Sequence, residues 1–250
     1  MISLLTFCFP SSPPGGGGSA NKFLNIAHRG ASGHAPENTF AAFDKAVEMK
    51  ADYFELDVQM SKDGHLVVIH DTIVDRTTDG TGEVKDLTLR ELKRLDAGKW
   101  YGPEFAGERI PTLEEVLDRY RGKIGILIEI KEPDLYPGIE EKVAEALKER
   151  NMHRPKGGKV IVQSFGHDTT RNFHRILPSV PVGVLLSHAD YPDGVTDEKL
   201  ASFADYADYV NPSQLLVDED LVRRIHTLGL QITPYTIRTQ EDADRMITAG

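Results

Sequence analysis

The sequence predicts a single α/β catalytic domain with the TIM-type (β/α)8 barrel fold, and two observations support this prediction. The chain has 250 residues, a length that is typical of one barrel of this kind. From Phe23 onward, short apolar runs alternate with stretches in which apolar residues recur at helical spacing. Repeated alternation of strand and helix indicates a parallel sheet with helical crossovers, and so many units favour closure into a barrel.

The predicted elements follow from this alternation. The apolar runs predicted to be strands are 24–28, 53–59, 66–70, 124–130, 160–165, 182–186, 206–211 and 231–237. The amphipathic stretches predicted to be helices are 38–49, 112–120, 139–150, 168–176, 197–204, 218–228 and 240–248. Thr112 followed by Glu115 fits a capping box at the start of one of these helices.

The number of strands leaves one question open. A tight turn makes the 66–70 run antiparallel to the strand before it, so the remaining runs provide only seven parallel strands. Either the 66–70 run is itself a barrel strand, or a last strand follows Gly250 and is missing from the sequence. We favour the missing strand.

Residues 1–22 are predicted to be a disordered tail and linker that precedes a barrel domain at 23–250. The apolar run 1–9 has no basic residues before it and is much shorter than a membrane span of ~20 residues. The Pro-, Gly- and Ser-rich run 10–19 follows it and is typical of a flexible linker, whether native or engineered. We therefore expect no stable membrane insertion and favour a cytoplasmic location, with a weak secretory signal as the alternative.

Composition excludes some partners. The formal net charge is −10 and the sequence pI is about 5.4, which argues against nucleic acid or an anionic membrane as the main partner. Cys8 is the only cysteine, so no intrachain disulfide can form. We expect a small-molecule substrate, and the oligomeric state is left open.

Residues 72–110 interrupt the strand and helix alternation. The segment has no clear strand, is rich in Gly, Asp and Thr, and contains Trp100, Tyr101 and Phe105. Long irregular segments in compact domains are usually functional. Because it directly follows His70 and Asp71, we predict a lid-like insertion over the site.

Three polar residues are predicted to converge in a hairpin. Asp63-Gly64 separates two apolar runs, which is a strong signal for a two-residue turn. If these two residues form the turn, Asp57 lies opposite His70. Glu55 and Asp57 are two residues apart and share a face, so both carboxylates are predicted to face His70. The alternative is a solvated polar face on an amphipathic hairpin.

Ionisable residues also end the other predicted strands, where the active sites of such barrels lie. The polar residues at these ends are His28, Glu55, Asp57, Glu129, Lys131 and Gln163. Glu129 and Lys131 share one face of their strand and are predicted to point inward. A structural salt bridge is the alternative interpretation of that pair.

This group of residues predicts chemistry at a phosphoryl group. Three carboxylates, Glu55, Asp57 and Glu129, repel one another unless a cation joins them, and oxygen ligands suit Mg²⁺ or Ca²⁺, with Mn²⁺ as an alternative. Arg29 and Lys131 add the positive charges with which proteins bind phosphate. His28 and His70 come from separate strands, so one can accept a proton while the other donates one.

The ordered motifs of the chain resemble the glycerophosphodiester phosphodiesterases from about residue 25 to the C-terminus. These motifs are His28-Arg29-Gly30-Ala31, Pro36-Glu37-Asn38-Thr39, Glu55-Leu56-Asp57-Val58, Asp63-Gly64, Val68-Ile69-His70-Asp71 and Glu129-Ile130-Lys131. The resemblance implies a phosphodiesterase-type TIM barrel and metal-dependent hydrolysis of glycerophosphodiesters to glycerol 3-phosphate and an alcohol. The roles it implies are acid/base catalysis for His28 and His70, Mg²⁺ or Ca²⁺ ligation for Glu55, Asp57 and Glu129, and phosphate contact for Arg29 and Lys131.

Two departures from the family pattern occur late in the chain. Tyr235-Thr236 stands where many members carry Trp-Thr, and it keeps an aromatic wall. With Gln163, we expect Tyr235 to contact substrate. Many members also continue past the position of Gly250 into a short strand.

Two other functions are considered. A lysophospholipase D-type or cyclising phosphodiesterase would need an apolar approach for an acyl chain, which Trp100, Tyr101 and Phe105 could provide. A binding protein without activity is less favoured, because no predicted ligand or acid/base residue is lost.

Overall fold

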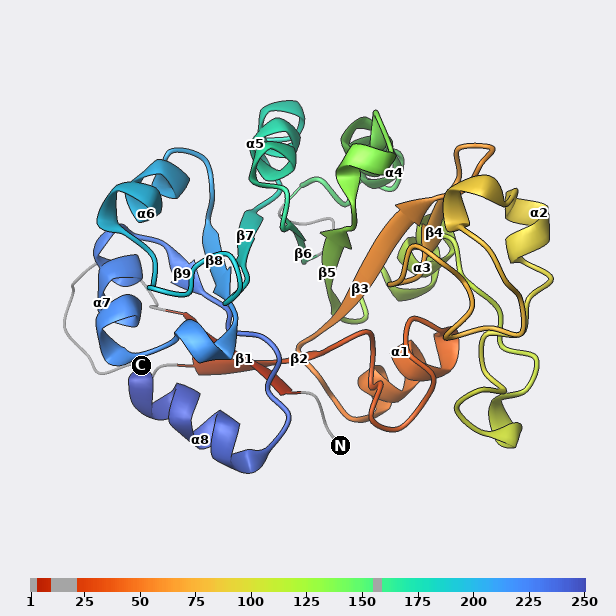
Figure 1. The fold of residues 1–250 in the computed structure, drawn as a ribbon, viewed down its shortest axis with the longest axis horizontal. Helices are drawn as coiled ribbons and strands as arrows, with labels where there is room; N and C mark the ends of the chain where they lie inside the picture. The colour runs from red at the N-terminus through yellow and green to blue at the C-terminus, as the bar shows by residue number, and fades with distance from the viewer. Residues whose placement is uncertain (1–3, 10–21, 155–158) are drawn as a thin grey trace.

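The barrel is formed mainly by parallel strands in the computed structural model, which describes residues 4–9, 22–154 and 159–250. Within these residues, seven parallel strands pair in sequence order around the ring (Figure 1). They are β2 (Lys22–Ala27), β3 (Tyr53–Met60), β5 (Gly125–Ile130), β6 (Val160–Ser164), β7 (Val182–Leu186), β8 (Tyr209–Pro212) and β9 (Gln231–Ile232). The predicted α/β barrel architecture is confirmed.

One antiparallel strand, β1 (Leu4–Phe9), closes the ring between β2 and β9. Residues 4–9 therefore differ from the disordered tail expected for 1–22, whereas residues 1–3 and 10–21 lie outside the described residues. The physical reason is that β2 and β9 would each present an unpaired edge, and the N–H and C=O groups of such edges pair readily with an extended segment.

The 66–70 run is not a barrel strand in the described residues. It forms the short strand β4 (Leu66–Val68), which pairs in the sheet with β3 alone. Strand β9 is also shorter than the predicted 231–237, because Pro234 has no backbone N–H to donate to a neighbouring strand.

The predicted helices are confirmed, with ends that shift by one or two residues. They surround the sheet in Figure 1. They are α1 (Phe40–Glu48), α3 (Leu113–Tyr120), α4 (Ile139–Glu149), α5 (His167–Ile176), α6 (Asp197–Ala204), α7 (Glu219–Thr227) and α8 (Gln240–Ala249). Thr112 and Glu115 form the predicted capping box, in which each side chain accepts the other's backbone N–H.

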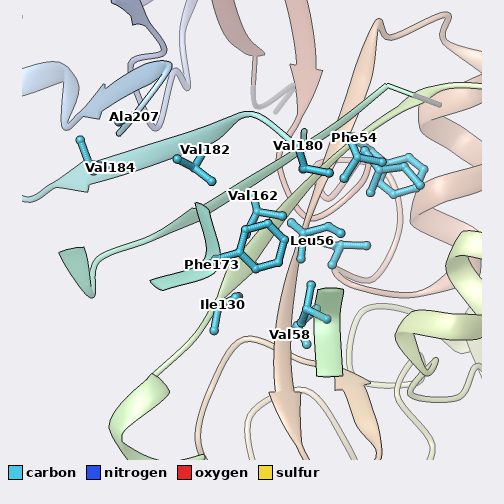
Figure 2. Close-up of a cluster of buried hydrophobic side chains, with 14 of the residues drawn as sticks. Phe54, Leu56, Val58, Ile130, Val162, Phe173, Val180, Val182, Val184 and Ala207 are labelled. Carbon is cyan, nitrogen blue, oxygen red and sulfur yellow. The ribbon is translucent and has the colours of Figure 1, made fainter. Parts of the chain in front are cut away.

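The main core lies between strands and helices, as Figure 2 shows for part of it. Phe54, Leu56 and Val58 on β3 are fully buried there, and burial of each such side chain stabilises the fold by about 1.5–3 kcal/mol. Since side chains alternate along a strand, Glu55 and Asp57 face the other way, into the barrel. The strand that anchors the core thus also positions two carboxylates.

The hairpin register was predicted wrongly by one residue. The observed pairs are Val58↔Val68, Gln59↔Val67 and Met60↔Leu66, and Ile69, not His70, donates to the carbonyl of Asp57 at 3.0 Å. The turn contains three residues, 62–64, because Ser61 donates to the His65 carbonyl at 2.9 Å. Gly64 has a φ of 81°, which fits the left-handed position that ends a three-residue hairpin loop.

His70 reaches the site because the chain bends after β4. The carbonyl oxygens of Ile69, His70 and Asp71 all accept from the side-chain nitrogen of Gln59, at 3.0, 2.8 and 2.7 Å. Gln59 is fully buried, and its oxygen accepts from the Tyr136 hydroxyl at 2.8 Å. One buried amide therefore holds three consecutive carbonyls and fixes the bend that carries His70.

Replacement of Gln59 by Leu is expected to lower the free energy of unfolding by about 3 kcal/mol, because the bend then loses its buried donor. Tyr136→Phe is the matched control, since it removes one hydrogen bond to Gln59 and should cost about 1 kcal/mol. Urea unfolding measures both values. A smaller loss in Gln59→Leu than in Tyr136→Phe would contradict this account.

Residues 72–110 contain short helical turns, including α2 (Leu89–Leu92), around a small core of their own. This core packs on Val67 and Ile69, at and just beyond β4. The Tyr101 ring contacts both Trp100 and Phe105. This packing does not test the lid role, which stays a prediction.

In the described part of the chain, no helix has the length and apolar character that a membrane span requires.

Candidate active site

His28 and Arg29 directly follow β2. Arg29 and Gly30 have positive φ values of 54° and 75°, and a Cβ on Gly30 would lie 2.7 Å from Ala42. Only glycine fits at position 30, and Arg29 beside it lines the cavity described below. Burial lowers the pKa of His28 to about 3, and the charge of Arg29 adds to this shift. His28 is therefore a neutral imidazole at pH 7.

Three buried carboxylates converge at the ends of β3 and β5. Asp57 and Glu129 are register partners, and ligand oxygens of Glu55, Asp57 and Glu129 lie within 4.8 Å of one another. Burial, together with the charge of Asp57, raises the pKa of Glu55 well above its ordinary value. Burial also raises the pKa of Glu129 to about 7, against the opposing charge of Lys131. The predicted convergence of these carboxylates is confirmed.

These carboxylates fit a divalent cation. Glu55 Oε1 is buried and has no hydrogen-bond partner among the described residues, so it is free to act as a ligand. Oxygen-only donors with negative charge suit hard divalent ions. The cluster is therefore a candidate divalent metal centre.

Two cationic side chains border the carboxylates. Lys131 Nζ lies 2.7 Å from Glu129 Oε1 and 3.9 Å from Asp57 Oδ1, and it also lies 3.3 Å from His70 Nε2. Arg29 Nε lies 3.5 Å from Asp57 Oδ2 and makes no hydrogen bond within the described residues. The pair Glu129–Lys131 is thus a salt bridge that also belongs to the site.

A chain of ion pairs connects His70 to Arg29. Asp71 Oδ1 lies 2.6 Å from His70 Nδ1, and Arg76 binds Asp71 through Nε at 2.6 Å and NH2 at 3.0 Å. Arg76 also binds both oxygens of Glu37, and Glu37 accepts from Arg29 NH1 at 2.8 Å. The hydrogen bonds from Arg76 hold the pKa of Asp71 well below its usual range, which keeps Asp71 ionised beside His70.

Three residues that hydrogen-bond to predicted site residues or their neighbours are not among those predicted from the sequence: Asn38, Asp71 and Arg76. The Asn38 amide donates to Asp57 Oδ2 at 2.8 Å and accepts from the Asp57 backbone N–H at 3.2 Å. Asn38 and Asp71 occur in the motifs that resemble the family, but the motifs alone do not assign them a contact. Arg76 lies in the irregular insertion, where neither periodicity nor a motif indicated it.

The site residues surround one cavity of about 140 Å³. Its lining residues are His28, Arg29, Glu55, His70, Leu127, Glu129, Lys131, Gln163, Phe165, Leu185, Asn211, Thr233, Tyr235 and Thr236. Every predicted site residue except Asp57 lines it, and Asp57 contacts Lys131 and Arg29 from behind. Trp100, Tyr101 and Phe105 do not line it.

Comparison with known proteins gives one consistent result. Residues 28–250 match the glycerophosphoryl diester phosphodiesterase family. A glycerophosphodiester phosphodiesterase of Caldanaerobacter subterraneus is 46% identical over 92% of this chain and 91% of that protein, and one from Bacillus subtilis is 41% identical over 93% and 82%.

A solved structure shares both the fold and part of the sequence. An Oleispira antarctica phosphodiesterase, in complex with the product sn-glycerol-3-phosphate, superposes with a TM-score of 0.79 at 30% identity, over 90% of this chain and 89% of that one. Together with the cavity described above, these similarities place the chain, as an enzyme, in the glycerophosphodiester phosphodiesterase family.

Proposed function

We propose that the enzyme hydrolyses glycerophosphodiesters, such as glycerophosphocholine and glycerophosphoethanolamine, to glycerol 3-phosphate and an alcohol in a metal-dependent reaction. The observation that carries the proposal is one cavity lined by two histidines, two cationic side chains, Glu55 and Glu129. Asp57 completes the carboxylate cluster beside it. The glycerol 3-phosphate bound to the Oleispira phosphodiesterase supports the same substrate class.

Glu55, Asp57 and Glu129 would hold one divalent cation, Mg²⁺ or Ca²⁺, with Mn²⁺ as the alternative. When bound, the ion supplies positive charge that polarises a phosphoryl oxygen. Asn38 holds Asp57 in place, because its amide donates to the carboxylate and accepts from the Asp57 backbone N–H. Burial and the charge of Asp57 raise the pKa of Glu55, so a cation beside Glu55 would favour its charged form.

Arg29 and Lys131 bind the phosphate oxygens in this proposal. Both side chains line the cavity, and the Nε of Arg29 has no hydrogen-bond partner within the described residues. Charge-assisted hydrogen bonds from these groups would neutralise the negative charge that develops at phosphorus. Tyr235 and Gln163 line the same cavity and are proposed to contact the substrate.

His28 and His70 transfer the protons. Neutral His28 can accept a proton from the attacking hydroxyl group. Asp71 holds Nδ1 of His70, so Nε2 is left to face Lys131 and the cavity. A carboxylate in this position orients the ring, and His70 is proposed to protonate the leaving alcohol through Nε2.

We expect the 2-deoxy substrate analogue, a propanediol phosphodiester, to have a kcat at least about a hundredfold lower than that of the glycerol substrate. The 2-hydroxyl of a glycerophosphodiester is held beside the phosphate, and intramolecular attack can reach effective molarities of about 10⁵ M or more. His28 would take the proton of this hydroxyl, and a cyclic phosphate would then be opened by water. Equal kcat values for the two substrates would exclude this route in favour of direct attack by water.

One coupled assay tests the function. Glycerophosphocholine, glycerophosphoethanolamine and lysophosphatidylcholine are each incubated with the enzyme, and glycerol 3-phosphate and choline are both measured. We expect glycerol 3-phosphate from the first two substrates. Preferred release of choline from lysophosphatidylcholine would instead support the lysophospholipase D-type alternative. The structure does not favour that alternative, because the aromatic residues that could contact an acyl chain, Trp100, Tyr101 and Phe105, do not line the cavity.

A further inference from the structure

The cavity has a charged part and a neutral polar part, and the proposed chemistry uses mainly the charged one. The charged side chains come from the ends of β2, β3 and β5 and from the bend after β4. The neutral polar residues include Gln163 on β6, Asn211 on β8 and Thr233 just after β9. The order of the strands therefore places these neutral groups together, along a separate arc of the barrel.

Two of the neutral residues carry buried polar atoms without partners. Asn211 and Thr233 are each only 1% exposed. Asn211 Oδ1 and Thr233 Oγ1 have no hydrogen-bond partner within the described residues. Buried polar groups are nearly always hydrogen-bonded, and one that is not costs about 1–3 kcal/mol. Because both residues line the cavity, a bound molecule can supply the missing hydrogen bonds.

A glycine on the intervening strand gives Asn211 its position. Gly183 on β7 is the register partner of Gln163, and a Cβ on Gly183 would lie 2.5 Å from Asn211 Nδ2. Without that Cβ, the Asn211 side chain crosses β7 and donates to Gln163 Oε1 at 2.6 Å. This hydrogen bond uses the nitrogen of Asn211 and fixes the amide, so that its oxygen remains as an acceptor.

We propose that Asn211 and Thr233 determine specificity by binding the hydroxyl groups of the glycerol moiety, an inference that rests on the proposed function. An amide oxygen and a hydroxyl are uncharged, and they match alcohol groups better than phosphate oxygens, which the cationic side chains bind. Leu127 and Leu185 provide apolar surface in the same cavity for the carbon atoms. A cavity of about 140 Å³ suits a small polyol and is well below the ~300 Å³ of a pocket for drug-sized ligands.

The proposal predicts selection against substrates without hydroxyl groups. An alkyl phosphoester of the same size would leave Asn211 Oδ1 and Thr233 Oγ1 unpaired after it displaces water from the cavity. Sites that are built to bind a substrate hydroxyl discriminate strongly against analogues that lack it. Binding of the polyol is therefore expected to be stronger than binding of its alkyl analogue, even where no chemical step occurs.

Calorimetric titration tests the proposal without any reaction. The enzyme is titrated with glycerol 3-phosphate and with n-propyl phosphate, in buffer with excess Mg²⁺ and, in parallel, excess Ca²⁺. We expect the wild type to prefer glycerol 3-phosphate, and Thr233→Val to lose about tenfold of that preference, which is the size of one hydrogen bond. Thr233→Ser keeps the hydroxyl and should retain the preference, and Asn211→Leu should lose it.

Gly183→Ala gives an independent check, because it displaces the Asn211 amide without removing it. We expect weaker binding of glycerol 3-phosphate and little change for n-propyl phosphate. If the wild type binds both ligands equally, or if Thr233→Val keeps the full preference, the inference is wrong although the proposed function stands. If neither ligand binds, the proposed function fails and the inference fails with it.

Discussion

Removal of divalent cations is expected to abolish phosphodiester hydrolysis, and Mg²⁺ or Ca²⁺ should restore it. Without a cation, the buried carboxylates of Glu55, Asp57 and Glu129 face one another within 4.8 Å. Two unit charges about 4 Å apart repel by ~4 kcal/mol at the effective dielectric constant near a protein surface. Without the cation, the site would also lack the positive charge that polarises a phosphoryl oxygen of the substrate.

The measurement is activity after chelation and dialysis, followed by titration with each ion. Glu129→Gln should raise the concentration of ion needed for half-maximal activity, because one negative ligand becomes neutral. Glu132→Gln is the matched control, since Glu132 lies close by in sequence but outside the carboxylate cluster. Full activity in excess chelator would show that the cluster does not serve a catalytic metal.

His28→Ala and His70→Ala are each expected to reduce kcat by a factor of about 10² to 10⁴, the usual contribution of a general acid or base. The imidazoles approach the same cavity from different strands, so neither can replace the other. Because His70 is held by Asp71 at 2.6 Å, Asp71→Asn should also lower kcat, with less effect on KM.

His65→Ala is the control for both histidine variants. His65 lies at the hairpin turn, with 52% of its side chain exposed, and it does not line the cavity. Its replacement should leave kcat within a factor of about two, since surface substitutions usually have small effects. Retention of more than about a tenth of wild-type kcat by His28→Ala or His70→Ala would remove that histidine from the acid/base pair.

Local patterns in the sequence predicted much of the fold and the convergence of the site. Helical spacing of apolar residues located the helices, and Thr112 with Glu115 located the start of α3. The two-residue alternation along β3 predicted that Glu55 and Asp57 share a face, and in the structure Phe54 and Leu56 on the opposite face lie in the outer core. These features are visible in sequence because strand and helix each impose a fixed period on the side chains.

The hairpin shows how a correct outcome can rest on a wrong register. Asp63-Gly64 predicted a two-residue turn, whereas the structure forms a three-residue loop with Ser61 and His65 as the closing pair. This shift should have turned His70 away from Asp57. Gln59 compensates, because its buried amide bends the chain after Val68. The sequence indicated that His70 belongs to the site, but tertiary contacts decided how it gets there.

By itself, the sequence determined which residues alternate, where elements begin, and which charged residues end the strands. Only the tertiary structure decided that β1 closes the ring, that Arg76 joins Asp71 to Glu37, and that Gly183 leaves space for Asn211. The physical reason is that a local pattern depends on neighbours along one element. By contrast, edge pairing, ion-pair networks and space beside a glycine depend on segments that meet only when the barrel closes.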